Sequence, residues 1–158
     1  MDALKIAGGR PLAGRIRVSG SKNAALPIMA ASLLASGTST LECVPELMDV
    51  QTLCRLLHHV GAHYTHTGSL WTLDAEHITQ PEAPYELVRT MRASFLLLAP
   101  LLLRKGYAKV SLPGGCAIGA RPVDLHLMAL EKLGAELHIE HGYVEARAPH
   151  GLVGAEIV

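Results

Sequence analysis

The sequence has no excess of charge of either sign. It carries 14 lysine and arginine residues and 14 aspartate and glutamate residues, so the formal net charge at pH 7 is +0. This balance argues against a general nucleic-acid or membrane-surface binder, because such proteins attract phosphates with a surplus of basic side chains. A local pocket for an anion stays possible.

Cysteines are few and do not form a pattern of pairs. Cys43, Cys54 and Cys116 are an odd number at wide spacing, which does not suggest a disulfide framework. The cytoplasm, which is reducing, is therefore the simplest expected compartment. Cys43 follows a strand-like run and Cys54 lies in an apolar helical pattern, so both are expected to be buried core residues.

The sequence also lacks a long apolar run. Residues 95–103 are strongly apolar, but they are far shorter than the roughly 20 residues of a membrane span, and a buried helix is the better interpretation. The N-terminus has no charged start followed by an apolar stretch, so no signal peptide is expected. With 158 residues, of which 49% are hydrophobic, the chain can form one domain with a sizeable core.

What the sequence does contain is an internal repeat. Residues 23–37 align with residues 92–106 at an offset of 69, and residues 60–62 align with residues 133–135 at an offset of 73. The change of offset suggests a small insertion between the halves. Repeats of this length indicate units that stack their apolar faces into one core, which usually takes three or more units. This chain holds two, and it resembles an unfinished repeat protein.

Each unit is expected to contain a helix, a strand, a second helix and a strand pair. The first helix of each unit is almost wholly apolar, which predicts burial on all sides. Pro27 and Pro100 should distort these helices, and Gly37 and Gly106 should end them. The second helices should end at glycines 61 and 134. The predicted strands are 38–43, 63–67, 70–74, 107–112, 136–140 and 143–146, and residues 154–158 are also strand-like.

Residues 114–126 carry the strongest chemical signal. Cys116 lies in a glycine-rich loop, and Arg121 and Pro122 follow where a helix is expected to begin. The free N–H groups of a first helical turn, together with an arginine, favour an anion, and a thiol near positive potential becomes reactive. The segment predicts a reactive cysteine beside a phosphate pocket, although a free cysteine is more often a small buried side chain.

Three stretches carry a resemblance to a known family. They are Gly-Ser-Lys-Asn-Ala at 20–24, Arg-Thr-Met-Arg-Ala-Ser at 89–94, and Pro-Gly-Gly-Cys-Ala-Ile-Gly-Ala-Arg-Pro-Val-Asp-Leu-His at 113–126. On these residues the chain resembles the N-terminal part of the bacterial UDP-N-acetylglucosamine enolpyruvyl transferases, a branch of the enolpyruvyl transferase (EPSP synthase-like) family. The resemblance covers essentially the whole chain. The shikimate-pathway branch is the nearest alternative, and the third stretch favours the UDP-sugar branch.

The resemblance implies an α/β (α+β) fold of repeated βαβαββ units around buried helices, an inside-out α/β barrel that is incomplete here. Residues 1–21 would be N-terminal strands that pack on a missing second domain. Residues 22–91 would be the first unit of the catalytic domain and residues 92–158 the second. The third unit and the second domain would be absent.

The implied reaction moves the enolpyruvyl group of phosphoenolpyruvate to the 3′-hydroxyl of UDP-N-acetylglucosamine and releases phosphate, by addition and elimination. This is the first committed step of peptidoglycan synthesis. It needs cations for the anionic substrate and an acid that protonates the methylene carbon, but no cofactor and no metal. The general base would come from the missing C-terminal portion, so little turnover is expected from this chain alone. The alternatives are a non-catalytic module that binds a nucleotide sugar or an anion, and a poorly folding remnant.

By resemblance, Lys22, Asn23 and Arg121 would bind phosphoenolpyruvate, with Lys22 also counted as catalytic. Without the resemblance, a solvated lysine near a helix end is the more common case for such a residue. Cys116 would be the acid, could form a covalent adduct with phosphoenolpyruvate, and would be the residue that fosfomycin alkylates.

UDP-N-acetylglucosamine would be bound mainly by the segment that follows the cysteine loop. Arg92 aligns with Asn23 in the repeat and would take part, whereas Arg89 is expected to be structural or exposed at the rim. Asp124 could instead be a first-turn carboxylate that stabilises its helix. The residues implied for this substrate are Arg92, Arg121, Pro122, Val123, Asp124 and Leu125.

Nine histidines raise the question of a metal. His58, His59, His63 and His66 are close in sequence, but Gly61 is expected to end the helix between them. No cysteine or carboxylate spacing completes a zinc site, so no metal site is expected. His126 is expected to orient neighbouring groups.

Overall fold

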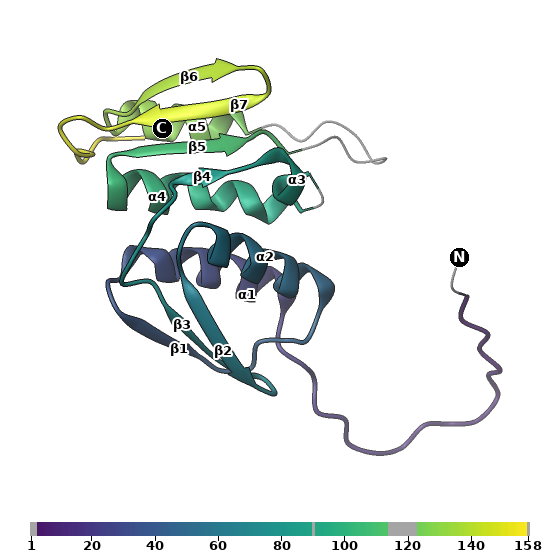
Figure 1. The fold of residues 1–158 in the computed structure, drawn as a ribbon. Helices are drawn as coiled ribbons and strands as arrows, with labels where there is room; N and C mark the ends of the chain where they lie inside the picture. The colour runs from purple at the N-terminus through teal and green to yellow at the C-terminus, as the bar shows by residue number, and fades with distance from the viewer. Residues whose placement is uncertain (1–2, 90, 114–122, 158) are drawn as a thin grey trace.

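Helices lie between two β-sheets in the computed structural model, which describes residues 3–89, 91–113 and 123–157 (Figure 1). The first sheet has the strand order β1-β3-β2 and the second β4-β5-β7-β6. Neighbouring strands are antiparallel except β4 and β5, which are parallel. The strands are β1 (Thr38–Leu41), β2 (His63–Thr67), β3 (Leu70–Asp74), β4 (Glu82–Ala83), β5 (Tyr107–Ser111), β6 (Glu136–Glu140) and β7 (Tyr143–Arg147).

The helices between the sheets include α1, α2 and α4, and α5 packs against β6 (Figure 1). In α2, apolar residues recur every three or four positions, and this face is buried. The α-helices are α1 (Lys22–Ala31), α2 (Met48–His59), α3 (Tyr85–Val88), α4 (Leu98–Lys105) and α5 (Asp124–Lys132), and the 3₁₀ segments are η1 (Ser32–Leu34) and η2 (Arg92–Leu97).

The repeat predicted from the sequence is present in the structure. The order β1-β3-β2 of the first unit recurs as β5-β7-β6 in the second, and both strand pairs cover the expected residues, with β7 one residue longer than expected. The helix α1 of the first unit corresponds to η2 and α4 together, and α2 corresponds to α5. The short strands β1 and β5 end one or two residues earlier than expected, at Leu41 and Ser111.

The insertion that changes the repeat offset lies inside the second unit and not between the units. Residues 42–47 connect β1 to α2, whereas residues 112–123 connect β5 to α5, so the second connection is six residues longer. The helix α5 is in turn shorter than α2, with 9 residues against 12. The strand β5 is also one residue longer than β1, and together these three differences raise the offset from 69 at β1 and β5 to 73 at the strand pairs.

The expectation that the apolar helices are buried on all sides is wrong for this chain. In α1, Leu26 and Met29 are buried, but Pro27 and Ile28 are exposed. The buried face packs on α2 and η2, and the described residues provide nothing that covers the other face. In α4, Leu103 is likewise 52% exposed.

The predicted effects of prolines and glycines on the apolar helices are confirmed at some positions and wrong at others. The helix α1 continues through Pro27, whereas Pro100 lies in the first turn of α4, just after the 3₁₀ segment η2. Gly106 ends α4 in the left-handed conformation with φ +68°, as expected. Gly37 does not end a helix, because η1 stops at Leu34.

Two further expectations are wrong. Cys43 is exposed and has φ +59°, because the strand ends at Leu41 and the chain turns sharply toward α2. Residues 148–157 contain no strand, so the strand-like C-terminal run is not one in this structure. Cys54 is buried, as expected.

The core is continuous across both units and consists mainly of aliphatic side chains. Trp71 is its largest fully buried side chain, with 2% exposure. The rings of His66 and Tyr64 stack on it at centroid distances of 4.2 and 5.8 Å. Trp71 is therefore a core residue.

Arg104, near the end of α4, joins the two units. Its Nη1 donates hydrogen bonds to the carbonyl oxygens of Leu33 and Ala35, both at 2.8 Å. Its Nη2 donates to the carbonyl oxygens of Ala75 at 3.0 Å and Glu76 at 3.2 Å. One guanidinium of the second unit therefore binds two separate loops of the first.

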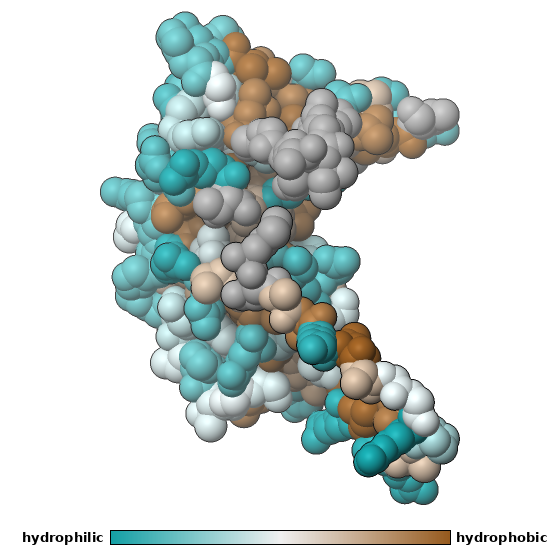
Figure 2. Space-filling view, turned by 90° about the vertical axis from the view of Figure 1, so that its right-hand side faces the viewer, coloured by the Kyte–Doolittle hydropathy of each residue, from teal (hydrophilic) through white to brown (hydrophobic). Residues whose placement is uncertain are grey.

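The N-terminal residues 3–20 form an arm without helix or strand that projects from the body (Figures 1 and 2). Its apolar side chains are exposed, so the arm buries almost none of its own surface. The expected packing of residues 1–21 on a second domain stays a prediction. The exposed large apolar residues of the arm are Leu4, Ile6, Leu12, Ile16 and Val18.

Candidate functional site

A cavity of about 500 Å³ lies where several helical segments begin. Lys22 is the first residue of α1, Asp49 is in the first turn of α2, Arg92 is the first residue of η2, and Val123 precedes α5. The complete lining is Lys22, Asn23, Leu26, Pro27, Asp49, Met91, Arg92, Ala93, Phe95, Leu96, Val123 and His126.

This convergence makes the cavity attractive to anions. The N-terminal end of a helix carries partial positive charge on N–H groups that lack a partner within the helix. Several such ends meet here, and the side chains of Lys22 and Arg92 add two full positive charges. Phosphate and carboxylate groups are the ligands that this combination favours.

Asp49 is the one carboxylate among the described residues that line the cavity. Its Oδ2 lies 2.7 Å from Nζ of Lys22, which donates a hydrogen bond to it. The two side chains are partly open to solvent, with 44% of Lys22 and 37% of Asp49 exposed. Sequence reasoning did not single out Asp49, and its place in a helical first turn is equally explained by the helix dipole.

Most of the remaining lining is apolar, and His126 lies beside it. Met91 and Phe95 are buried, and the rings of Phe95 and His126 meet edge to face at a centroid distance of 6.0 Å. Because apolar walls exclude water, they strengthen the electrostatic field of the cations beside them. Met91, Phe95 and Leu96 were not predicted as site residues, since apolar positions in a buried helical pattern look like core.

The structure brings Lys22, Asn23 and Arg92 to one cavity, although they lie about 70 residues apart in sequence on corresponding helices of the two units. Val123 also lines it. Asp124 and Leu125 begin α5 and are exposed, with Leu125 at 69%, and neither lines the cavity. The remaining predicted residues, Cys116, Arg121 and Pro122, lie outside the described residues.

Arg89 does not belong to this group. Its Nε lies 3.4 Å from Oε2 of Glu86, and its side chain is 54% exposed. The expectation that Arg89 is structural or exposed at the rim is confirmed. Exposed pairs of this kind contribute little to stability.

The described cysteines differ in their environment. Burial raises the pKa of Cys54 to about 12, so its thiol stays protonated and inert at neutral pH. Cys43 is exposed and lines a smaller hollow of about 300 Å³ beside Gly20 and Ser21. Gly20 is tightly enclosed there, since a Cβ added to it would lie 1.6 Å from the carbonyl oxygen of Cys43.

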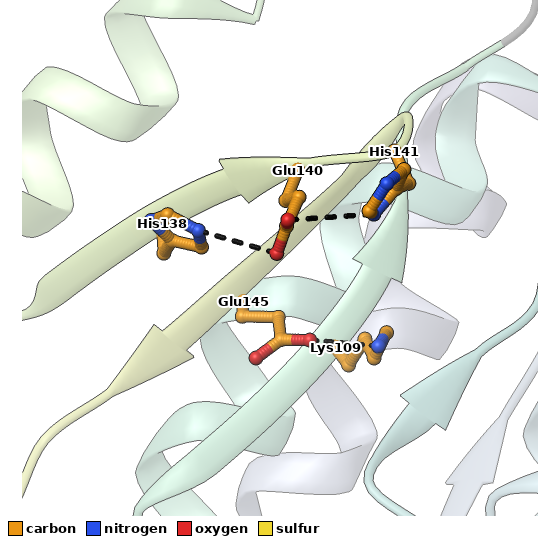
Figure 3. A network of polar contacts seen from close by, with 5 residues as sticks. All are labelled: Lys109, His138, Glu140, His141 and Glu145. Carbon is orange, nitrogen blue, oxygen red and sulfur yellow. Dashed lines mark hydrogen bonds and ion pairs between the residues drawn. The ribbon is translucent and has the colours of Figure 1, made fainter.

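A second polar cluster lies on the second sheet, across β5, β6 and β7 (Figure 3). Nζ of Lys109 lies 2.7 Å from Oε1 of Glu145, and this hydrogen bond raises the pKa of Lys109 and lowers that of Glu145. Glu140 accepts contacts from His138 at 3.4 Å and His141 at 3.6 Å. The charges of this cluster are paired with one another, unlike the surplus of positive charge in the cavity.

The histidines of the first unit do not gather around one point. His58 and His63 meet edge to face at 5.7 Å, while His66 stacks on Trp71. Among the described residues, no group of three or more histidine, cysteine, aspartate or glutamate side chains is arranged to hold a metal ion. Within the same residues, no helix is both long and apolar enough to span a bilayer.

The fold and the cavity define a class of protein. The family model described as EPSP synthase (3-phosphoshikimate 1-carboxyvinyltransferase) matches residues 6–157, and the chain belongs to this family. The structure of the enolpyruvyl transferase NikO from Streptomyces tendae is similar, with a TM-score of 0.78 and 28% identity over 92% of this chain and 32% of that one. EPSP synthase from Acinetobacter baumannii shares the fold, with a TM-score of 0.55 at 14% identity over 82% of this chain and 29% of that one.

Among curated proteins, the chain is similar to several named UDP-N-acetylglucosamine 1-carboxyvinyltransferase. The protein from Beijerinckia indica is 58% identical over 99% of this chain and 39% of its own length. That from Desulfosudis oleivorans is 54% identical over 99% of this chain and 37% of its own length. The chain therefore spans well under half the length of these relatives, and it has no closed barrel in its described residues.

Proposed function

We propose that this chain is the N-terminal part of a UDP-N-acetylglucosamine 1-carboxyvinyltransferase, which acts in the cytoplasm in peptidoglycan synthesis. The whole enzyme transfers the enolpyruvyl group of phosphoenolpyruvate to the 3′-hydroxyl of UDP-N-acetylglucosamine and releases phosphate. The chain by itself has little turnover, since the remaining part of the enzyme supplies the general base. Its identity of 50–58% with proteins of that name supports the proposal.

The observation that carries the proposal is the shared cavity of Lys22, Asn23 and Arg92. Both substrates are anionic, one through its carboxylate and phosphate and the other through its diphosphate. A pocket with two cationic side chains and several helical N-termini suits such ligands. In the proposal, Lys22, Asn23 and Arg121 bind phosphoenolpyruvate, and Arg92 and residues 121–125 bind the sugar nucleotide.

Cys116 is the proposed acid of the addition step and the proposed target of fosfomycin. A thiol in this role gives its proton to the methylene carbon while the sugar oxygen attacks the adjacent carbon. The neighbouring positive charge stabilises the resulting thiolate. Cys116 is the cysteine of the connection that is longer in the second unit than in the first.

The test is the mass of the intact chain after incubation with fosfomycin, with and without UDP-N-acetylglucosamine, followed by peptide mapping. A single adduct on Cys116 that forms faster with the sugar nucleotide supports the proposal. The variant Cys116→Ser is the control and should stay unmodified. No adduct, or equal modification of Cys43 and Cys116 under both conditions, would contradict a functional pocket in this chain.

A binding role for this chain alone is the second candidate. The observation behind this candidate is that Lys22, Asn23 and Arg92 line one cavity within the described residues of this chain. Saturable binding of UDP-N-acetylglucosamine without fosfomycin modification of Cys116 would favour this candidate over the catalytic one.

A further inference from the structure

The carboxylate of Asp49 is out of place in a pocket for anions. It lines the same cavity as Lys22 and Arg92, where a negative charge repels the phosphate or carboxylate of a ligand. Yet its Oδ2 lies 2.7 Å from Nζ of Lys22, as close as a charge-assisted hydrogen bond permits. In this structure the cation expected to bind phosphate is therefore paired with an acid of the protein itself.

We propose that Asp49 is a positioning residue that acts as the internal counter-ion of Lys22 and releases it to an incoming phosphate group. The inference rests on the proposed function, because it assumes that the cavity binds a phosphorylated substrate. The proposed role of Asp49 adds that a bound anion replaces this carboxylate as the partner of the Lys22 ammonium group. Until an anion binds, the carboxylate fixes the lysine side chain, and its charge lowers the affinity of the site for anions.

The geometry makes this exchange easy. Both side chains are more than one third exposed, and an ion pair in such a setting is weak because water screens it. A phosphate dianion carries twice the charge of a carboxylate and offers several acceptor oxygens, so it outcompetes Asp49 for the same ammonium group. Released from Lys22, the carboxylate stays in the first turn of α2, where the helix dipole stabilises a negative charge.

Lys22 and Asp49 also belong to different helices that pack against each other. Lys22 begins α1 and Asp49 lies in the first turn of α2, so the pair links the N-terminal ends of these two helices beside the cavity. No other carboxylate lies within 4.0 Å of Nζ of Lys22 in the described part of the chain. Any release of Lys22 therefore depends on Asp49.

The experiment is a titration of the purified chain with inorganic phosphate at constant ionic strength, followed by the amide NMR signals of Lys22 and Asn23. The variant Asp49→Asn keeps the shape of the side chain and removes its charge. We expect it to bind phosphate about five times more tightly than the natural chain, the effect of about one unit charge at close range in water. The variant Lys22→Gln should bind more weakly.

The double variant Lys22→Gln/Asp49→Asn separates this role from simple repulsion. If Asp49 acts through Lys22, removing its charge brings no gain once Lys22 is gone, and the double variant binds like Lys22→Gln. A matched control is Glu131→Gln, an equal change of charge at the far end of α5, which should leave phosphate affinity unchanged.

Several results would overturn the inference. One is that Asp49→Asn binds phosphate no more tightly than the natural chain, and another is that no variant binds phosphate at all. The inference is also overturned if the gain in phosphate affinity persists in full in the double variant, or if Glu131→Gln shows an equal gain. Failure of the proposed function looks different, because it appears as missing fosfomycin modification of Cys116. If Asp49→Asn does not change phosphate affinity but fosfomycin still modifies Cys116, only the proposed role of Asp49 is overturned.

Discussion

Replacing Arg104 by methionine should loosen the junction between the two repeat units. The substitution keeps an unbranched apolar stem and removes the guanidinium that donates to four backbone carbonyl groups. Two of these bonds, to Leu33 and Ala75, are partly buried, so their loss leaves acceptors that water reaches poorly. The other two, to Ala35 and Glu76, are exposed and can be replaced by water.

The magnitude follows from the two partly buried bonds. A hydrogen bond to a charged group contributes about 1.5–3 kcal/mol, and bonds from a single guanidinium do not add fully. We therefore expect Arg104→Met to lower the free energy of unfolding by about 2–4 kcal/mol, a large share of the total for a domain of this size. Arg104→Lys should lose nearly as much, because a point charge cannot reach both loops at once.

The assay is equilibrium unfolding in urea, followed by circular dichroism and the fluorescence of Trp71. The matched control is Lys105→Met, the next residue on α4, which is exposed and bonds to no loop among the described residues. It should change the free energy by no more than about 0.5 kcal/mol. Equal losses in Arg104→Met and Lys105→Met would refute the idea that Arg104 holds the units together.

Other predictions concern the core, a helix end and the thiols. Leu101→Ala should cost about 2–5 kcal/mol because Leu101 is 0% exposed, whereas Leu103→Ala, at a position 52% exposed, should cost far less in the same urea assay. Gly106→Ala should cost about 1 kcal/mol, because Gly106 has φ +68°, and an added Cβ would make only an ordinary contact of 3.7 Å with the carbonyl oxygen of Ala148, so backbone strain alone opposes the methyl group. At pH 8 an aromatic disulfide reagent should modify Cys43 in the folded chain and leave Cys54 untouched until urea is added. Because burial raises the pKa of Cys54 from 9.0 to about 12, this thiol should not affect stability below pH 9.0 but should reduce it as the pH rises from there toward 12, an effect absent in Cys54→Ala.

The strand pairs were the easiest part of the fold to predict. Pairs of strand-like runs close together in the sequence, 63–67 with 70–74 and 136–140 with 143–146, predicted both hairpins, and the structure has them in β2–β3 and β6–β7. Hairpins depend on contacts between residues close in sequence, so local pattern suffices. The repeat was equally visible because both copies bury the same positions.

Burial of the apolar helices was not predictable from composition. A wholly apolar helix is typical of a core, but the exposure of Ile28 and Leu103 depends on which elements are available to cover them. The left-handed turn at Cys43 was not predicted either, because the residues before it are strand-like, and its close approach to Gly20 joins segments that are separate in the sequence.

The candidate site was predictable only in part. The polar residues Lys22, Asn23 and Arg92 stood out through their place in the repeat and through family resemblance. Asp49 could not be found this way, because an acid in a first helical turn is common and carries no sign of a lysine 27 residues away. Its pairing with Lys22 arises from the packing of α1 on α2, which only the structure shows.

The two connections that follow β1 and β5 suggest how a repeated protein can acquire chemistry. In the first unit the connection is six residues long (42–47), holds Cys43, and is pinned beside Gly20. In the second it is twelve residues long (112–123) and holds Cys116, the residue 73 positions later, which is the offset of the strand pairs. The proposed acid therefore lies in the connection whose length differs between the two units, while the strand order of the sheets is the same in both. A change of chemistry between such repeats needs a change in one connection only, and the sheets that carry it can stay as they are.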